Sequence, residues 1–129
     1  MLSVYLVGIP TYHESDEVTV KYVVYNENNE ELKRDTRYTS YKKPVLVGMY
    51  ALMMLLKEIK EYEKEDITVY VNDGALIEQV QRTTTTRNHD VLKVAELTRK
   101  HIRKFNPKLK LHSVAGNFEE MKDWEAKLS

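Results

Sequence analysis

The stretch ITVYVNDGALIEQVQ, residues 67–81, decides the fold of this chain. Its first five residues form an apolar run of strand length, which predicts a β-strand over 67–71. Asn72-Asp73-Gly74 then breaks the pattern, and a short helix is predicted over 75–81. A strand that leads straight into a helix indicates alternating β and α structure, so the elements on either side decide the kind of sheet.

Three predicted strands precede this stretch. They cover residues 2–9, 18–25 and 32–41, and polar turns at 13–17 and 26–30 separate them. The first strand is apolar and is expected to be covered on both faces, whereas the third is mostly polar and is expected at a sheet edge. The opening of the chain therefore predicts a three-stranded antiparallel meander.

Helices and one more strand complete the pattern. Apolar side chains recur at helical spacing over 44–63, with lysine and glutamate on the other face, which predicts a long amphipathic helix. Asn88 is suited to cap a helix over 89–105, a strand is predicted over 109–114, and a last helix over 117–128. The order βββ-α-β-α-α-β-α implies an α/β fold with a mixed sheet and helices on both faces.

Composition limits what the chain can be. Its 129 residues predict one domain, 1–129. The absence of cysteine excludes disulfides, zinc–thiolate sites, iron–sulfur clusters and cysteine nucleophiles. Twenty basic residues balance twenty acidic ones, so net charge indicates no partner. The longest apolar stretch, residues 45–56, is about 12 residues and too short for a membrane span. No signal-peptide pattern begins the sequence, so we expect a cytoplasmic protein without membrane contact.

Four short strings carry a further signal through their order and spacing. Residues 67–73 are an apolar run ending in an aspartate, and residues 75–80 begin the helix after it. Residues 114–116 read Val-Ala-Gly after the last predicted strand, and residues 123–128 place an aspartate in the final helix. In this order the strings resemble the ribonuclease H-like superfamily over essentially the whole chain. The resemblance implies a ribonuclease H-like α/β fold, with a five-stranded mixed sheet in the order 3-2-1-4-5 and helices on both faces.

The resemblance also implies a set of site residues. In the superfamily, four acidic side chains converge on two magnesium ions, which activate water and stabilise the leaving oxygen during phosphodiester cleavage. The matching positions in this chain are Gly8 or Ile9, Val47 or Gly48, Asn72 and Asp123. Asp73 follows one residue late, so the candidates for a degenerate site are Asn72, Asp73 and Asp123. With most carboxylates missing, the resemblance implies no bound metal and no catalytic residue.

Each candidate also has an ordinary structural interpretation. Asn72 and Asp73 are suited to accept backbone hydrogen bonds where a strand turns into a helix. Asp123 is suited to a solvated helix face, next to Trp124, which we expect to dock that helix onto the core. The sequence favours these structural interpretations over a metal site.

The clearest charge pattern lies between residues 82 and 110, where only Asp90 and Glu96 oppose nine basic side chains. Such a cluster is an electrostatic footprint for phosphates if it gathers on one side of the fold. The candidate nucleic-acid-binding residues are Arg82, Arg87, Lys93, Arg99, Lys100, Arg103 and Lys104. The alternative is a solvated helix face. Nine tyrosines add candidates for base stacking, for which the alternative is half-buried strand aromatics.

Three functions are compatible with these observations. The favoured one is a catalytically inactive ribonuclease H-like domain that acts as a nucleic-acid-associated binding module, with an RNA-containing or DNA partner. The alternative is a protein-interaction or assembly module on the same scaffold, which the balanced net charge supports. The third is a divergent metal-dependent ribonuclease that uses Asp73 and Asp123, with Asp66 or Asp90, and magnesium. The sequence thus weighs against an enzyme and predicts no cofactor unless the third hypothesis holds.

Overall fold

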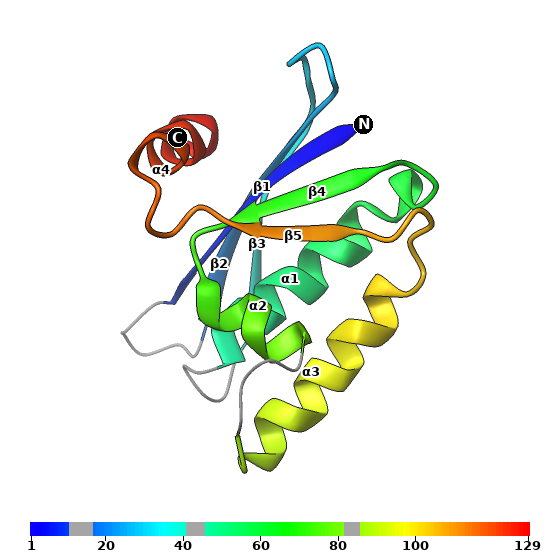
Figure 1. The fold of residues 1–129 in the computed structure, drawn as a ribbon, viewed down its shortest axis with the longest axis vertical. Coiled ribbons are helices and arrows are strands. Elements are labelled where there is room, and N and C mark those ends of the chain that lie inside the picture. Colours follow the sequence, from blue (N-terminus) through cyan, green and yellow to red (C-terminus); the bar gives the residue numbers. More distant parts are fainter. Residues whose placement is uncertain (11–16, 41–45, 82–85) are drawn as a thin grey trace.

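A computed structural model gives the structure, and it describes residues 1–10, 17–40, 46–81 and 86–129. The elements follow one another in the predicted order (Figure 1). They are β1 (Leu2–Pro10), β2 (Glu17–Tyr25), β3 (Glu31–Ser40), α1 (Val47–Glu58), the 3₁₀ helix η2 (Lys60–Tyr62), β4 (Ile67–Val71), α2 (Gly74–Gln81), α3 (His89–Ile102), β5 (Lys110–Ser113) and α4 (Phe118–Leu128).

The five strands form one mixed sheet in the order β3-β2-β1-β4-β5, which confirms the predicted order. The first three strands pair antiparallel, with Val4 opposite Val24 in the β1–β2 ladder. β4 joins β1 in parallel, and β5 joins β4 in parallel, with Tyr70 beside His112. β3 and β5 are therefore the two edges of the sheet.

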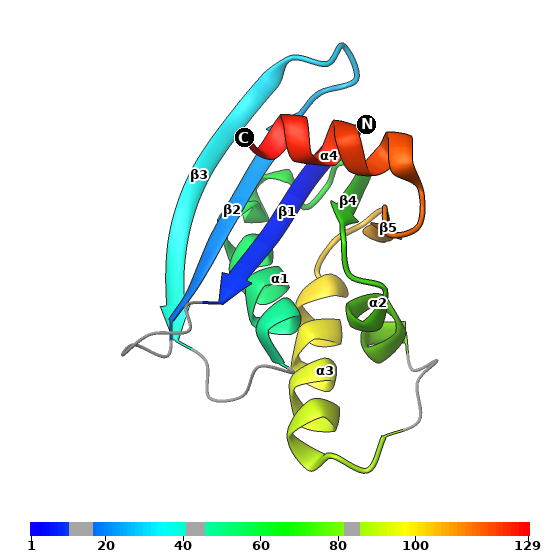
Figure 2. The ribbon, with the colours of Figure 1, turned by 90° about the vertical axis from the view of Figure 1, so that its left-hand side faces the viewer.

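Helices cover both faces of the sheet, as predicted. Figure 2 shows α4 crossing one face, while α1, α2 and α3 lie on the other side. The larger hydrophobic core forms on the α1 side, from alternate residues of the strands and the apolar faces of α1, α2 and α3. A smaller core forms under α4, from Tyr5, Val23, Val114, Trp124 and Leu128.

The helices α3 and α4 begin at the asparagine caps that the sequence predicts. The Asn88 side chain accepts hydrogen bonds from the backbone N–H groups of Asp90 and Val91 and so caps α3. Asn117 caps α4 in the same way through the N–H of Glu120, at 3.0 Å. The predicted start of the long helix, residues 44–45, lies outside the described residues.

The helix ends differ from the prediction. The helix expected over 44–63 ends at Glu58, and η2 follows it. The helix expected to reach residue 105 ends at Ile102, because the chain turns there and buries Phe105 in the main core. None of the described helices is long and apolar enough to cross a membrane.

Candidate functional site

A hollow of about 450 Å³ lies beside β1, between the start of α1 and the start of α2. We call it the glycine hollow and define it by Gly8, Val47, Gly48, Asn72 and Asp73. Asn72 and Asp73 come from the turn between β4 and α2. The structure thus brings together the positions that the resemblance matched on the first strand, on the long helix and after the fourth strand.

Asp73 is engaged in holding the start of α2. Its Oδ1 atom accepts a hydrogen bond from the backbone N–H of Leu76, at 3.0 Å. This is the turn chemistry that the sequence favours for the residue. Asn72 is exposed at the end of β4.

The two glycines of the hollow mark places where backbone and side chains approach closely. A Cβ atom placed on Gly8 lies 2.8 Å from the Cβ of Ala51, and one placed on Gly48 lies 2.6 Å from Oδ2 of Asp73. Both distances are shorter than real Cβ contacts. A larger side chain at either position therefore requires α1 or the Asp73 carboxylate to move.

Asp123 lies outside the glycine hollow, and its neighbour Trp124 lines the hollow instead. The Trp124 Nε1–H donates to the carbonyl oxygens of Leu6 at 3.2 Å and of Tyr70 at 3.1 Å. Asp123 accepts a hydrogen bond from the Tyr5 hydroxyl at 3.4 Å and pairs with Lys127. Of the three degenerate-site candidates, the structure brings Asn72 and Asp73 together but leaves Asp123 apart.

The other acids considered for a metal site also lie elsewhere. Asp66 precedes β4, 3.9 Å from the Nζ of Lys110, and Asp90 is in the first turn of α3. Among the residues that the structure describes, no three histidine or acidic side chains gather closely enough to hold a metal ion.

The basic segment divides into exposed and engaged side chains. Lys93 and Lys100 are exposed on α3, and Lys104 is exposed just beyond its end. Within the described part of the chain, none of these three lysines has a hydrogen-bonding or ion-pair partner. Arg87 is exposed ahead of α3, and Arg82 lies outside the described residues.

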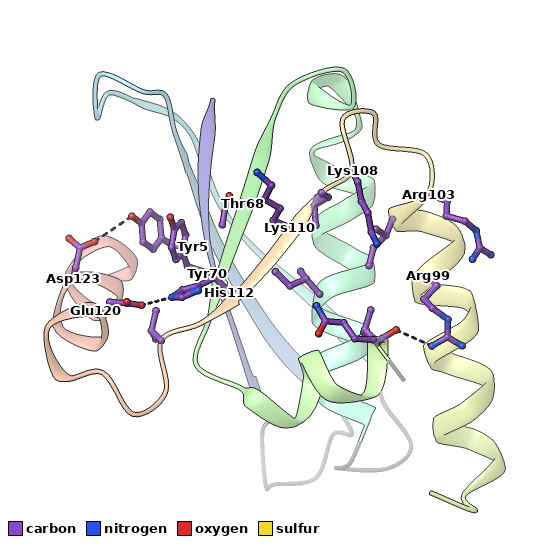
Figure 3. Close-up of a pocket in the computed structure, with 16 residues that line it drawn as sticks. Tyr5, Thr68, Tyr70, Arg99, Arg103, Lys108, Lys110, His112, Glu120 and Asp123 are labelled. Carbon is purple, nitrogen blue, oxygen red and sulfur yellow. Dashed lines mark hydrogen bonds and ion pairs between the residues drawn. The ribbon is translucent and has the colours of Figure 1, made fainter. Parts of the chain in front are cut away.

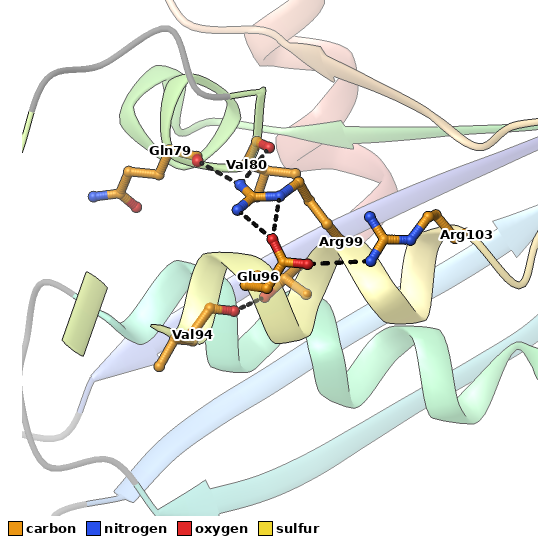
Figure 4. A network of polar contacts seen from close by, with 7 residues as sticks. Gln79, Val80, Val94, Glu96, Arg99 and Arg103 are labelled. Carbon is orange, nitrogen blue, oxygen red and sulfur yellow. Dashed lines mark hydrogen bonds and ion pairs between the residues drawn. The ribbon is translucent and has the colours of Figure 1, made fainter. Parts of the chain in front are cut away.

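Arg99 instead joins two helices (Figure 4). Its guanidinium donates to the carbonyl oxygens of Gln79 and Val80, at 3.4 and 3.1 Å, where α2 ends. It also forms an ion pair with Glu96 at 2.8 Å, and its side chain is 18% exposed. Arg103 pairs with the other oxygen of Glu96 at 3.2 Å but stays largely exposed. The position of Arg99 thus favours a structural role for that residue.

A second and larger hollow follows the edge strand β5 (Figure 3). It measures about 1200 Å³, and we call it the β5 groove. Lys108 and Lys110 form its cationic end, Tyr5, Tyr70 and His112 form its aromatic end beside α4, and Arg99 and Arg103 line it from α3. This groove was not predicted from the sequence. The available signal is the alternation of Lys108, Lys110 and His112 with Leu109 and Leu111.

The aromatic end of the β5 groove is tightly packed. Tyr5 and Tyr70 stack with ring centroids 5.0 Å apart, and His112 meets Tyr70 edge-on at 5.5 Å. Burial, followed by the negative charge of Asp123, raises the pKa of the Tyr5 hydroxyl. This hydroxyl therefore stays protonated at neutral pH and acts as a hydrogen-bond donor to Asp123.

Comparison with known proteins identifies the fold of the chain but not its function. No protein-family model and no curated protein sequence matches the chain. Solved structures do match it. Ribonuclease H1 from the halophilic archaeon Halobacterium salinarum NRC-1 aligns with a TM-score of 0.76 and 13% identity, over 92% of this chain and 89% of that one.

Two further structures give the same result. LC11-RNase H1, solved in complex with an RNA/DNA hybrid, aligns with a TM-score of 0.73 and 12% identity, over 90% of this chain and 86% of that one. The N-terminal ribonuclease H domain of a Mycobacterium tuberculosis protein aligns with a TM-score of 0.72 and 11% identity, over 98% and 94% of the two chains. The chain therefore has the ribonuclease H-like fold.

Proposed function

We propose that this chain is a nucleic-acid-binding module built on the ribonuclease H-like fold, and that it does not cleave its ligand. The observation that carries the proposal is the set of exposed lysines on and after α3, Lys93, Lys100 and Lys104, which have no anionic partner among the described residues. Unpaired surface cations of this kind neutralise phosphates and release counterions on binding. The RNA/DNA hybrid bound by LC11-RNase H1 makes a hybrid the first ligand to test.

The glycine hollow supports the absence of cleavage. The superfamily reaction needs two magnesium ions about 4 Å apart, and these repel one another unless several carboxylates surround them. In the hollow, Asp73 is the acid that is present, and one of its oxygens already accepts the Leu76 N–H. Asn72 supplies no charge, and Gly8 and Gly48 supply no side chain at the two other matching positions. These residues do not fit a magnesium pair.

Fluorescence anisotropy titrations with a labelled RNA/DNA hybrid, duplex DNA and single-stranded DNA test the binding. We expect affinity to fall steeply between about 50 and 200 mM salt. The double variant Lys93→Ala with Lys100→Ala should weaken binding to all three ligands and reduce the salt slope by about two. The matched control is Lys60→Ala with Lys64→Ala, which removes the same charge at exposed positions after α1. Salt-independent binding, or equal losses in both double variants, would contradict the proposal.

Cleavage is measured on the same hybrid in millimolar magnesium. We expect no hydrolysis, and we expect Asp123→Asn to change affinity by no more than a few-fold, because the Tyr5 hydroxyl and Lys127 already hold the Asp123 carboxylate. Magnesium-dependent cleavage that Asp123→Asn abolishes would favour the divergent ribonuclease instead.

The assembly module remains the alternative prediction. Large apolar side chains that are exposed among the described residues are spread over several elements rather than gathered on one. They are Met1, Ile9, Leu32, Tyr38, Leu92, Leu97 and Phe118. Such scattered side chains are ordinary on a protein surface, so the structure gives this alternative no specific support.

A further inference from the structure

The β5 groove contains a stretch of sheet that α4 leaves open. α4 packs on β1 and β2, and β5 is an edge strand, so the outer part of β4 and β5 lies beyond the helix (Figure 3). In the parallel ladder, Thr68 lies beside Lys110 and Tyr70 lies beside His112. Because side chains alternate between the two faces of a strand, these four residues share one face. The Lys110 side chain and the rings of Tyr70 and His112 therefore lie next to one another along the groove.

The cationic end of the groove is available to a ligand. Lys108 is exposed, and no partner for it lies in the described part of the chain. The Lys110 side chain is 67% exposed, and its nearest acid is Asp66 at 3.9 Å. Arg103 lines the groove from α3, on the other face of the sheet, and pairs with Glu96. Exposed pairs at such distances contribute little, so phosphate groups can compete for these cations.

The aromatic end presents a ring to the groove. Tyr70 rests on the buried Tyr5 ring, which fixes its orientation. The His112 side chain is 47% exposed and meets Tyr70 edge-on. A planar ring held in place on a sheet offers a stacking surface for a nucleic-acid base.

Two carboxylates also line the aromatic end, and both have partners. Glu120 pairs with His112, and Asp123 is held by the Tyr5 hydroxyl and by Lys127. Both carboxylates are thus engaged within the chain, whereas Lys108 at the other end has no such partner among the described residues. The groove therefore has exposed lysines at one end and aromatic rings at the other. Lys110 and His112 are two residues apart on β5, which corresponds to roughly 7 Å along the strand.

We infer that the β5 groove binds a single strand of nucleic acid, with a base against His112 and Tyr70 and the neighbouring phosphates against Lys108 and Lys110. This inference rests on the proposed function and specifies its ligand and surface. The faces of bases in a duplex are covered by their neighbours, so stacking on a protein ring selects unpaired strands. Among the residues that the structure describes, the exposed lysines of α3 have no aromatic partner of this kind, and they remain a general phosphate surface.

Two variants of one residue separate stacking from charge. His112→Ala and His112→Phe both release Glu120, but only the second keeps a ring. For a labelled single-stranded oligonucleotide we expect His112→Ala to weaken binding by at least about five-fold, and His112→Phe to bind within two- to three-fold of the wild type. Equal losses in the two variants would overturn the stacking assignment.

A second pair of double variants shows whether the single strand binds in the β5 groove or on α3. Lys108→Ala with Lys110→Ala removes two charges, as Lys93→Ala with Lys100→Ala does, so each should reduce the salt slope by about two, but the groove variant should weaken binding of the single strand more than the α3 variant does. If the α3 variant alone weakens binding, the proposed function stands and the groove assignment fails. If the wild type binds no oligonucleotide, both fail.

A competition experiment tests the chemical class of the ligand. Unlabelled single-stranded DNA should displace the labelled strand, and poly-glutamate of equal charge should displace it far less, because it has no bases to stack. Equal displacement by poly-glutamate would show that the groove recognises negative charge alone, and would favour an acidic protein segment as its occupant.

Discussion

The hydroxyl of Tyr22 is an exception in a well-packed core. The side chain is 1% exposed, and no hydrogen-bond partner for the hydroxyl exists among the described residues. Burial, followed by the negative charge of Glu58, raises the pKa of this hydroxyl. A buried hydroxyl without a partner costs about 1–3 kcal/mol.

Tyr22→Phe should raise the free energy of unfolding by about 1 kcal/mol, because phenylalanine fills the same space without the hydroxyl. Urea unfolding at neutral pH measures the change. The advantage should grow above pH 10, because the unfolded wild type releases its tyrosine proton at a lower pH than the folded one. At neutral pH the control Tyr5→Phe should bring no gain, since its hydroxyl is bonded to Asp123. A less stable Tyr22→Phe variant would mean that the hydroxyl is satisfied in solution.

The sequence predicted the direction of side chains on the last helix but not the contact between α2 and α3. Asp123 is exposed on the last helix and Trp124 is buried, as the sequence favours, because successive helical residues point about 100° apart. The large apolar side chain of Trp124 packs against the sheet, so Asp123 lies on the flank of α4 beside Lys127. The sequence places Arg99 among the candidate phosphate-binding cations, but its guanidinium donates to the carbonyl oxygens of Gln79 and Val80 at the end of α2. Such a contact between helices has no local sequence pattern.

The elements themselves were predictable because their signals are local. Asparagine caps, apolar alternation and the break at residues 72–74 each act within a few residues, and together they give the observed order. Helix ends depend on tertiary packing instead. α3 ends three residues early because Phe105 turns into the main core, and the last turn predicted for the long helix becomes η2.

The contact between β1 and α1 depends on a residue without a side chain. Gly8 faces Ala51 so closely that Gly8→Ala must push α1 away from the strand. We expect a loss of about 1–3 kcal/mol in the free energy of unfolding, measured in urea. The matched control is Gly74→Ala at the start of α2, where nothing lies within 4 Å of the added methyl group. It should be neutral or stabilise slightly. Equal effects of the two substitutions would show that α1 does not pack on Gly8 as described.

The molecule as a whole is built on two cores of unequal size. α1 contributes to the larger core, whereas α4 is held by the smaller one beneath Trp124 and Leu128. Segments with fewer buried contacts open at lower free energy than the global unfolding. The two faces of the sheet should therefore differ in how readily their helices detach.

Amide hydrogen exchange tests this difference between the faces. The amides of α4 should exchange at least about ten-fold faster than those of α1, once intrinsic rates are corrected. The polar contacts of α4, such as the Arg34 guanidinium on the carbonyl oxygen of Lys127 at 2.8 Å, limit the difference. Equal protection of α1 and α4 would mean that the smaller core is as stable as the larger one.

Trp124 is the single tryptophan of the chain, and its indole lies between α4 and the sheet. Selective excitation of this one chromophore therefore gives an emission spectrum that belongs to a known place. A docked α4 corresponds to a blue-shifted maximum, and a lifted α4 exposes the indole to water and shifts it to the red. The indole N–H donates a hydrogen bond to the carbonyl oxygen of Tyr70, and Tyr70 lines the β5 groove. A nucleic-acid strand that enters the groove should therefore also alter the emission. The protein carries its own optical probe of helix docking and ligand entry, without any attached dye.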